Sequence, residues 1–255
     1  MDTNPRGGLA FDDEDVAAAY AHRPPYPNAL FAFLDELPGQ RRRALDLGCG
    51  TGKLAHRLAA SFECVDAVDP SAAMLRVARD DHYPNIHWIH GFAETAKLAD
   101  RYDVVTAGAS IHWMDHAALF PRLADVLDPE GYIAIVEGDG AHDPAWQVEW
   151  EGFLARWLAR LGSAYVPAAY RARMTAYRDR LAIAGERTFE GTYSQSIASF
   201  IECQHSRATW SRANLGDELS AEFDAELREV LLRYAVDGVV TYKTRAEVVW
   251  GGSGE

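Results

Sequence analysis

The chain has 255 residues, a hydrophobic content of 48% and a formal net charge of −13 at pH 7. That length suits one large α/β domain, and that apolar content is enough for a packed core, which excludes a disordered or fibrous protein. The acidic balance, without a Lys- or Arg-rich tail or stripe, excludes nucleic acid and anionic membrane surfaces as favoured partners, because both reward basic patches.

The sequence also limits the compartment and the partners. The first residues lack a basic region followed by an apolar run, and no stretch reaches the roughly 18 apolar residues of a membrane helix. Cys49, Cys64 and Cys203 have no metal-ligand spacing, which favours reduced thiols. We therefore expect a cytoplasmic protein that acts on a small molecule and binds no metal, nucleic acid or membrane. A homodimer or a small accessory protein stays open.

The elements before position 44 are predicted to be helical. After a loose lead over residues 1–10, residues 12–21 are expected to form a short helix that ends at the proline-rich stretch 22–27. A second helix is expected over residues 28–37, with Asn28 as its N-cap and Pro38-Gly39 as its stop.

Strands and helices alternate from position 44 to position 137. The predicted strands are 44–47, 64–68, 86–89, 103–107 and 132–137, the last after a turn at 128–131. The predicted helices are 53–60, 71–79 with Ser71 as its cap, and 115–127. This rhythm is typical of a parallel sheet that is covered by helices on both faces.

The rhythm ends after Glu137. Residues 139–186 have an aromatic and Arg-rich helical pattern with no strand signal. Beyond them we expect a strand at 188–193, helices at 197–212 and 219–234, a last strand at 239–249 and a flexible tail at 251–254.

The strongest motif, Leu45 to Gly52, lies directly between a predicted strand and a predicted helix. Gly48, Gly50 and Gly52 let the backbone turn tightly and approach a ligand without Cβ clashes. Asp69 closes the next strand about 20 residues further on, where a carboxylate in dinucleotide folds accepts hydrogen bonds from ribose hydroxyls.

Two details distinguish this motif from a nicotinamide or flavin site. The pattern G-x-G-x-x-G needs its third glycine at position 53, where this chain has Lys53. Asp46, just before the turn, would repel a pyrophosphate but suits an ammonium group such as that of S-adenosylmethionine. We therefore predict an S-adenosylmethionine site rather than a purely structural glycine turn.

Over roughly residues 16–140 the sequence resembles the class I S-adenosylmethionine-dependent methyltransferases. The likeness rests on the glycine turn, on Ala67–Ser71 with Met74 following, and on Gly91–Glu94. A narrower likeness, to the group that contains trans-aconitate methyltransferase, rests on Tyr20-x-x-Arg23-Pro24-x-Tyr26-Pro27 and on Ala109–Asp115, which leads into Leu123–Gly131.

The resemblance implies an α/β fold with a doubly wound, seven-stranded, mostly parallel sheet of order 3-2-1-4-5-7-6. The stretch 239–249 would be its antiparallel strand, and a helical lid would follow strand 5. The resemblance divides the chain into a cofactor-binding core with a helical lead (1–138), a lid for substrate recognition (139–186), and a C-terminal part with strands 6 and 7 and a further lid helix (187–255).

The resemblance also assigns cofactor-binding roles to residues of this chain. Gly48, Gly50 and Gly52 would line the methionine and ribose, with Asp46 near the ammonium group and Asp69 on the ribose. Adenine would lie against Pro70 and Met74 and border Ala93 and Glu94. The methionine carboxylate would be closed over by Tyr20 and Arg23. Ala109 completes the set with Phe92, which replaces an Asp or Ser of many relatives and would pack on the adenine ring.

On the acceptor side, His112 is the predicted catalytic residue because it follows the fourth strand at the ligand-facing end of the sheet. The alternative is that it packs beside Trp113 and bonds the backbone. Glu137, at the end of the fifth strand, either faces the pocket or bonds a nearby backbone group. His112 and His116 have a helical spacing that suits a metal, but no third ligand presents itself, so no metal is predicted.

The lid carries candidates for apolar walls and for cations that would attract an anionic acceptor. The aromatic residues are Trp146, Trp150, Phe153, Trp157, Tyr165 and Tyr170. The cationic residues are Arg156, Arg160, Arg171, Arg173, Arg178 and Arg180. The alternative is a pair of amphipathic helices with core tryptophans and solvated arginines. The stretch 202–207 is expected to form the other wall of the pocket.

These features predict methyl transfer from S-adenosylmethionine to a small molecule, with a carboxylate or hydroxyl acceptor favoured over an amine or carbon. Most of the rate would come from alignment, and a base is needed only when the acceptor loses a proton. Two other functions stay open. One is ring closure or rearrangement in a natural-product pathway without methyl transfer, and the other is a non-catalytic ligand- or partner-binding module, against which a closed aromatic cavity under residues 139–215 would argue.

Overall fold

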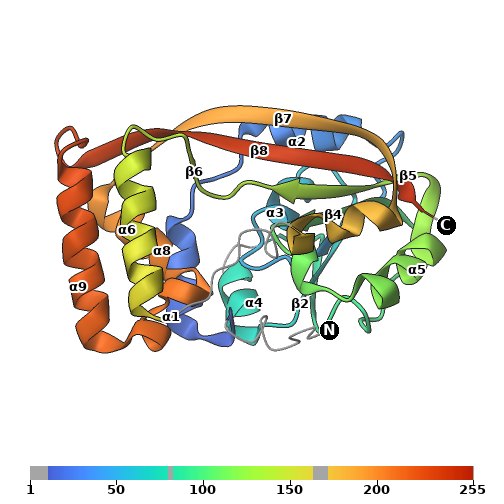
Figure 1. The fold of residues 1–255 in the computed structure, drawn as a ribbon. Coiled ribbons are helices and arrows are strands. Elements are labelled where there is room, and N and C mark those ends of the chain that lie inside the picture. The colour runs from blue at the N-terminus through green and yellow to red at the C-terminus, as the bar shows by residue number, and fades with distance from the viewer. Residues whose placement is uncertain (1–10, 80–82, 163–171, 255) are drawn as a thin grey trace.

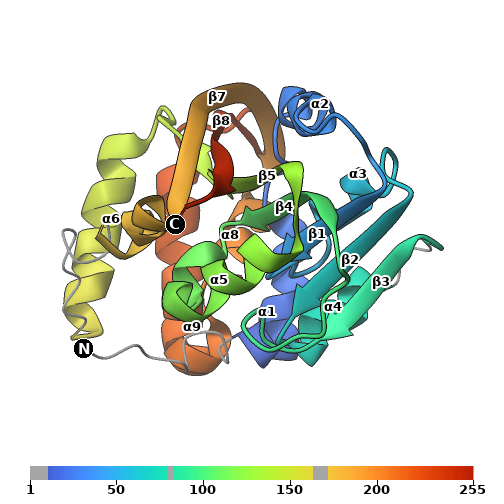
Figure 2. The ribbon, with the colours of Figure 1, turned by 90° about the vertical axis from the view of Figure 1, so that its right-hand side faces the viewer.

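The computed structural model describes residues 11–79, 83–162 and 172–254 (Figures 1 and 2). Its centre is a sheet of order β3-β2-β1-β4-β5-β8-β6, in which β7 pairs with β8. Strands β1 to β5 are all parallel to one another, whereas β8 is antiparallel to β5. The predicted order 3-2-1-4-5-7-6 is confirmed, because β8 and β7 are the seventh and sixth predicted strands and β6 is a short additional pairing.

The strands in chain order are β1 (Arg43–Leu47), β2 (Cys64–Asp69), β3 (Ile86–His90), β4 (Tyr102–Gly108), β5 (Leu127–Glu137), β6 (Ala141–His142), β7 (Leu181–Ser196) and β8 (Val239–Ser253). The α-helices are α1 (Glu14–Ala19), α2 (Asn28–Glu36), α3 (Ala55–Leu58), α4 (Ala72–Ala78), α5 (His116–Val126), α6 (Gln147–Arg160), α8 (Ile197–His205) and α9 (Arg212–Leu232). Short 3₁₀ turns are η2 (Tyr20–His22), η3 (Ile111–Trp113), η4 (Ala176–Arg180) and η5 (Ala208–Trp210).

Both faces of the central strands are buried, so successive residues belong to different cores. Val104 packs with α2, α3 and α4 on one face, while Val105 packs with α5 and η4 on the other. The same alternation holds for Ala134 and Ile135 in β5. Two-sided burial explains why these strands read as continuous apolar runs in the sequence.

A separate apolar core joins α6, α8 and α9, which stand together at the left of Figure 1. Phe153, Trp157 and Phe223 are buried at its centre, with the ring of Phe223 edge-on to both of the others. Phe153 and Trp157 are therefore core residues and do not form the apolar pocket wall for which they were candidates. Within the described residues, no helix is both long and apolar enough to cross a bilayer.

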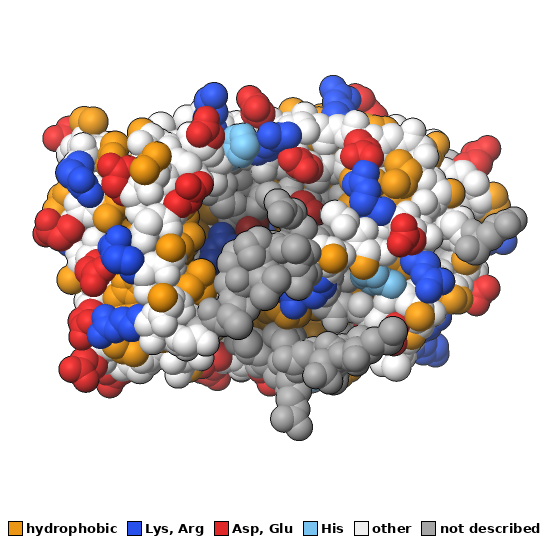
Figure 3. Space-filling view, viewed as in Figure 1, with side chains coloured by type: hydrophobic (Ala, Val, Ile, Leu, Met, Phe, Trp, Pro, Cys, Tyr) orange, Lys and Arg blue, Asp and Glu red, His pale blue; other side chains and the backbone are white. Residues whose placement is uncertain are grey.

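The outer surface of this helical group is a mixture of charges (Figure 3). Arg156 lies 3.6 Å from Glu226, and Arg160 lies 2.5 Å from Glu222, both on α9. These two arginines were candidates for attracting an anionic acceptor, but they belong to solvated ion pairs between helices. The predicted aromatic and cationic residues Tyr165, Tyr170 and Arg171 lie outside the described residues.

The segment 139–186 was predicted to be helical without strands. That prediction is wrong in part, because the segment contains β6 and the start of β7. Strand β7 begins at Leu181, and most of its side chains are exposed. Its residues Leu181, Ala182 and Ile183 pair with Ser253, Gly252 and Gly251. The predicted flexible tail is therefore wrong, because these glycines continue β8. A Cβ on Gly251 would lie 2.1 Å from the carbonyl oxygen of Ala182, so the strands approach closely there.

Other boundaries differ from the predicted ones. Asn28 is the first residue of α2 rather than its cap. Pro27 occupies the cap position and makes no side-chain cap bond. Residues 128–131 lie within β5, beside a register shift against β4, instead of forming a separate turn. The predicted helix 197–212 ends at His205, and α9 begins at Arg212 with a break at Gly216. By contrast, Ser71 caps α4 as predicted, and Asp115, the predicted first residue of the next helix, is the cap of α5.

Candidate functional site

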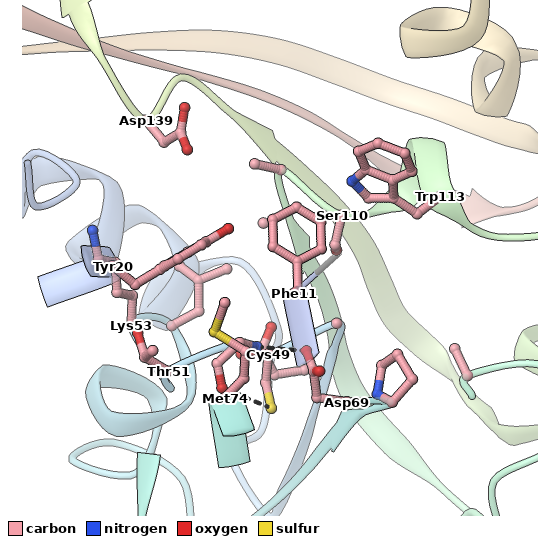
Figure 4. Close-up of a pocket in the computed structure, with 18 of the residues that line it drawn as sticks. Phe11, Tyr20, Cys49, Thr51, Lys53, Asp69, Met74, Ser110, Trp113 and Asp139 are labelled. Carbon is pink, nitrogen blue, oxygen red and sulfur yellow. Dashed lines mark hydrogen bonds between the residues drawn. The ribbon is translucent and has the colours of Figure 1, made fainter. Parts of the chain in front are cut away.

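A cleft opens at the carboxyl ends of the parallel strands, and we call it the strand-end cleft (Figure 4). Its volume is about 1070 Å³ with the open mouth included. It brings together most of the residues predicted to bind the cofactor. These are Tyr20, Arg23, Asp46, Gly48, Gly50, Asp69, Pro70, Met74, Phe92, Ala93, Glu94 and Ala109.

Two predicted site residues lie outside the lining of this cleft. Gly52 packs against side chains instead, since a Cβ there would lie 2.8 Å from both His56 and Trp88. Its φ of 84° still requires glycine, so its role is to shape the turn. His112, the predicted catalytic residue, lies behind Trp113, which does line the cleft.

The glycine turn after β1 has the left-handed backbone that its sequence suggests. Gly48 has φ 62° and Gly50 has φ 53°. A Cβ on Gly48 would lie 2.6 Å from the Cβ of Ser110, which follows β4. Glycine is therefore needed both for the conformation and for the close approach of two strand ends, and the backbone itself forms part of the cleft.

Asp69, at the end of β2, fixes the position of this turn. Its Oδ2 accepts a hydrogen bond from the Gly50 N–H at 2.8 Å, and its Oδ1 accepts one from the Ser71 N–H at 2.8 Å. Burial raises the pKa of the carboxyl, while these two donors act in the opposite direction. Each oxygen retains a second lone pair, so the carboxylate can also accept hydroxyl hydrogen bonds from a ligand in the cleft.

Asp46 lies deeper, at the end of β1, and is 1% exposed. Its Oδ1 accepts a bond from the Thr106 hydroxyl at 2.8 Å, and its Oδ2 accepts one from the Ala55 N–H at 3.1 Å. Burial raises the pKa of this carboxyl to about 7. Asp46 therefore connects the cleft floor to α3 and β4, and a cation nearby would ionise it.

The entrance is lined by the N-terminal lead. The Arg23 guanidinium stacks over the Tyr20 ring, with its central carbon 3.8 Å from the ring centroid. Arg23 donates to the Ser206 hydroxyl at 2.7 Å and to the Ser206 carbonyl at 2.8 Å, and it pairs with Asp139. Its planar fork is thus already engaged by the protein, which differs from the predicted clamp on a ligand carboxylate.

Several lining residues were not predicted from the sequence. These are Phe11, Cys49, Thr51, Lys53, Leu54, Gly108, Ser110, Met114 and Asp139, together with Tyr26 and Trp113, which were noted only as parts of motifs. Phe11 lies between Tyr20 and Trp113, with ring centroids 6.2 and 5.9 Å away (Figure 4). Asp139 could have been predicted from the sequence, because it follows β5 and so lies at the same edge of the sheet as the predicted site residues.

Lys53 and Asp139 lie near Arg23 and are electrostatically linked to it. The Lys53 ammonium donates to the carbonyl oxygens of Arg23 and Pro24 at 3.0 and 3.1 Å. Burial lowers the pKa of Lys53 to about 8. Burial would raise the pKa of Asp139, but Arg207, Arg23 and Lys53 hold it below its ordinary value. Asp139 is therefore ionised at neutral pH.

His112 and Glu137 form a buried polar pair beside the cleft. His112 Nδ1 lies 3.9 Å from Glu137 Oε1, and neither atom has a hydrogen-bond partner among the described residues. Burial lowers the pKa of His112 to about 4 and raises that of Glu137 to about 8. Both groups are thus mainly neutral at pH 7. The His112 ring also packs on Trp113, with centroids 4.9 Å apart, as the alternative interpretation expected.

One group among the described residues has the spacing of metal ligands: Cys64, Asp66 and His87, at the opposite end of β2. Asp66 already accepts hydrogen bonds from Arg43 at 3.1 Å and from the Tyr102 hydroxyl at 2.6 Å. The guanidinium of Arg43 provides the positive charge that a metal would bring, so we assign this group a structural role.

Comparison with known proteins shows which proteins this chain is similar to. Residues 44–131 match the family model of a methyltransferase domain. An uncharacterized methyltransferase of Mycobacterium tuberculosis is 41% identical over 122 residues, which is 48% of this chain and 49% of that protein. Trans-aconitate 2-methyltransferase of Methylobacterium radiotolerans is 34% identical over 142 residues, 51% of this chain and 54% of that enzyme. The chain thus spans about half the length of the curated relatives that it matches.

A solved structure extends the similarity of fold to most of the chain. It is described as a candidate type II methyltransferase from Anaeromyxobacter dehalogenans, with a TM-score of 0.66 and 25% identity over 90% of this chain and 97% of that one. The fold is the one found in class I S-adenosylmethionine-dependent methyltransferases, and residues 44–131, which include the glycine turn and Asp69, are similar to a methyltransferase domain. Within that class, the chain resembles the group that contains trans-aconitate methyltransferase.

Proposed function

We propose that the protein transfers the methyl group of S-adenosylmethionine to a carboxylate or hydroxyl oxygen of a small molecule. The observation that carries the proposal is the bond between Asp69 and the Gly50 N–H at 2.8 Å, which holds a left-handed glycine turn open at the ends of β1 and β2. A backbone turn beside a ribose-binding carboxylate is the arrangement expected for an adenosine cofactor.

Each part of the cofactor has a matching region of the strand-end cleft. The methionine part would lie along Gly48 and Gly50, with its ammonium group near Asp46 and its carboxylate near Tyr20. The ribose hydroxyls would donate to Asp69. Adenine would lie among Pro70, Met74, Ala93 and Glu94, covered by Phe92, which is 50% exposed and available for packing. Ala109 would border the methionine part from β4.

The cofactor supplies an activated methyl group on a sulfonium. The chain would contribute alignment of the acceptor oxygen with that group and exclusion of water from it. A carboxylate acceptor loses no proton, so this alignment suffices. A hydroxyl acceptor needs a base, and neutral His112, whose ring packs on Trp113 of the cleft, would take that proton.

The acceptor class is supported by the relatives. Trans-aconitate 2-methyltransferases of Methylobacterium radiotolerans and Deinococcus radiodurans are similar to this chain over about half of it, at 34% and 35% identity. Their named substrate carries carboxylates, which favours an oxygen acceptor here too. The segment 139–186 would act as the lid over this acceptor. The protein would work as a cytoplasmic enzyme without nucleic acid or membrane partners.

Calorimetric titration tests the cofactor site. We expect S-adenosylmethionine and S-adenosylhomocysteine to bind with roughly micromolar dissociation constants, near −8 kcal/mol. Asp69→Ala should weaken both by about 1.5–3 kcal/mol, the range for losing a hydrogen bond to a charged group. NAD is the control and should not bind, because Lys53 replaces the third glycine. Unchanged affinity in Asp69→Ala would remove the basis of the proposal.

A second measurement separates methyl transfer from ring closure or rearrangement on the same fold. Turnover of an acceptor should produce one S-adenosylhomocysteine per product molecule. Product formation without S-adenosylhomocysteine would favour the alternative reaction.

A further inference from the structure

A second cavity lies beside the strand-end cleft, between α6, α8 and β8, and we call it the aromatic groove. Its aromatic lining consists of Trp146, Trp150, Phe200, Trp210 and Tyr242. Its volume is about 1520 Å³ with the open mouth included. Such a cavity is large enough for a small organic molecule and suits one that is mainly apolar.

The groove contains a buried hydrogen-bond donor. The Trp146 Nε1–H has no partner among the described residues, although the side chain is 1% exposed. Its ring lies edge-on to Phe200 and Tyr242, with centroids 5.6 and 5.9 Å away. A buried donor without a partner is unfavourable, so an occupant whose apolar body carries an oxygen atom that reached this N–H would be favoured.

The two cavities share a wall, and it is charged. Arg23 and Asp139 line the strand-end cleft, whereas the next residue along the chain in each case, Pro24 and Gly140, lines the aromatic groove. Arg207 lines the groove and lies 3.5 Å from Asp139. We call Arg23, Lys53, Asp139 and Arg207 the charged wall (Figure 4 shows Lys53 and Asp139 from the cleft side).

The charged wall has more cations than anions. In this set, Arg23, Lys53 and Arg207 accompany one carboxylate, that of Asp139, and all three cations act to lower the pKa of that carboxyl. An anion on either side of the wall would therefore be attracted. Among the described residues, the ionic side chains that line the groove are Arg207 at the wall and Glu151 on α6. One carboxylate is accommodated, but a tricarboxylate would place further negative charges among aromatic rings and beside Glu151.

We propose that the aromatic groove binds the methyl acceptor and that this acceptor is a monocarboxylic acid with a flat or branched apolar body. The carboxylate lies against Arg207 at the charged wall, and the apolar body lies among Trp146, Trp150 and Phe200. The inference rests on the proposed methyl transfer. In the reaction a carboxylate oxygen forms a bond to the methyl carbon while the carbon–sulfur bond breaks, giving a methyl ester and S-adenosylhomocysteine with no proton to remove.

The test uses 2-naphthoate as the probe and trans-aconitate as its polyanionic counterpart, each titrated calorimetrically into the full chain with and without S-adenosylhomocysteine. We expect 2-naphthoate to bind at least tenfold more tightly than trans-aconitate. Ala155→Trp adds a large side chain to the groove lining and should weaken 2-naphthoate at least tenfold. The matched control is Ala159→Trp, on an exposed position one turn later in α6, which should change nothing.

Two further variants locate the carboxylate and the buried donor. Arg207→Gln should weaken 2-naphthoate about tenfold, and Arg207→Lys should restore part of that loss. Trp146→Phe keeps an aromatic ring without the N–H, so 2-naphthoate, whose only oxygens lie at Arg207, should bind unchanged. The related 6-hydroxy-2-naphthoate, whose hydroxyl can accept from the N–H, should bind this variant three- to tenfold more weakly than the wild type. Tighter binding of trans-aconitate, no binding of 2-naphthoate, or equal binding in Ala155→Trp and wild type would each overturn the inference. S-adenosylhomocysteine is titrated separately, so failure of the cofactor site is seen independently of failure of the groove.

Discussion

The strand-end cleft and the aromatic groove are adjacent, but they are lined by different kinds of chemical group. The cleft is formed by strand ends, a left-handed glycine turn and buried carboxylates held by backbone N–H groups. The groove is formed by aromatic side chains at the start of α6 and from α8, η5 and β8, and its charged side chains within the described ranges are Arg207 and Glu151. Backbone geometry suits a ligand of fixed structure, whereas a side-chain lining can change its ligand by substitution.

The difference separates positions at which the fold requires a particular residue from positions at which it tolerates substitution. Replacing a turn glycine disturbs the sheet edge itself, because two strand ends meet there. Replacing a groove aromatic such as Trp146 or Tyr242 disturbs the apolar core of α6, α8 and α9, to which both side chains belong. Variants in the cleft should therefore affect both stability and cofactor binding, whereas a variant at the exposed groove position Ala155 should affect the acceptor alone.

The largest effect is expected from Gly48→Ala. The left-handed backbone costs about 1–2 kcal/mol for a residue with a Cβ, and contact at 2.6 Å with Ser110 adds about 1–3 kcal/mol. The free energy of unfolding in denaturant should therefore fall by about 2–5 kcal/mol, with cofactor binding reduced more than a hundredfold. Such a loss of binding corresponds to about 2.7 kcal/mol or more.

Gly162→Ala is the matched control for this prediction. Gly162 has φ 61°, almost the value of Gly48, but no atom of the described part of the chain lies within 4 Å of a Cβ built there. This variant should lose only the conformational part, about 1–2 kcal/mol, and keep full cofactor affinity. Equal destabilisation by the two variants would show that close packing of the strand ends contributes nothing.

The next effect is a pH dependence from Asp46. Burial raises its pKa to about 7, so the carboxyl is mainly protonated at pH 6 in the free protein. An ammonium group beside it favours the charged form, so cofactor binding should release a proton at pH 6.5. Affinity for S-adenosylhomocysteine should then rise about five- to tenfold from pH 6 to pH 7.5, the range in which the free carboxyl ionises.

Calorimetry in two buffers of different ionisation enthalpy measures the released proton. Asp46→Asn is nearly isosteric, and it should abolish the release and flatten the pH dependence. The sign for stability is opposite: the raised pKa makes the free protein less stable as pH rises from about 4 toward 7. A release that persists in Asp46→Asn would assign the proton to another group and move the ammonium site away from β1.

The cleft was largely predictable from the sequence because its signals are local. Gly48, Gly50 and Asp69 lie within a strand–turn–helix unit and its successor, and the caps at Ser71 and Asp115 depend only on the next three residues. Alternation of strands and helices then determines the sheet. The two-sided burial of β1, β2, β4 and β5 left a clear apolar pattern in each.

The remaining features depend on partners that are distant along the chain. Residues 181–187 form a strand because they pair with residues 248–253 of β8, although most of their side chains are exposed and show no strand pattern. Arg23 bonds Asp139 and Ser206, which lie 116 and 183 positions later. No local pattern reveals that such a fork is already engaged, nor that Trp146 and Tyr242 line one cavity.

The smallest expected effect concerns residues 11–27, here called the lead, in which Arg23 lines the cleft and Pro24 lines the groove. The Ser71 hydroxyl donates to the Phe11 carbonyl at 2.7 Å, and the Ala72 N–H donates to Asp12 at 3.1 Å, so the lead docks on α4. Val16 packs with Met74, which also lines the cleft. A cofactor against Met74 and Tyr20 should therefore slow hydrogen exchange of residues 11–27, because opening of the lead would first have to release it.

Tyr20→Phe is the variant for this last prediction, because Arg23 also bonds Ser206 and its removal would disturb that contact. Loss of one hydroxyl donor to the cofactor carboxylate should raise the dissociation constant of S-adenosylhomocysteine about three- to tenfold, the range for one hydrogen bond. The protection of residues 11–27 on binding should fall by a similar factor, while exchange in α9 stays the same. Equal exchange of the lead with and without S-adenosylhomocysteine would make this segment a fixed wall. In that case the charged wall would separate the two cavities permanently, and the acceptor would have to approach the methyl group from the side of His112 and Trp113.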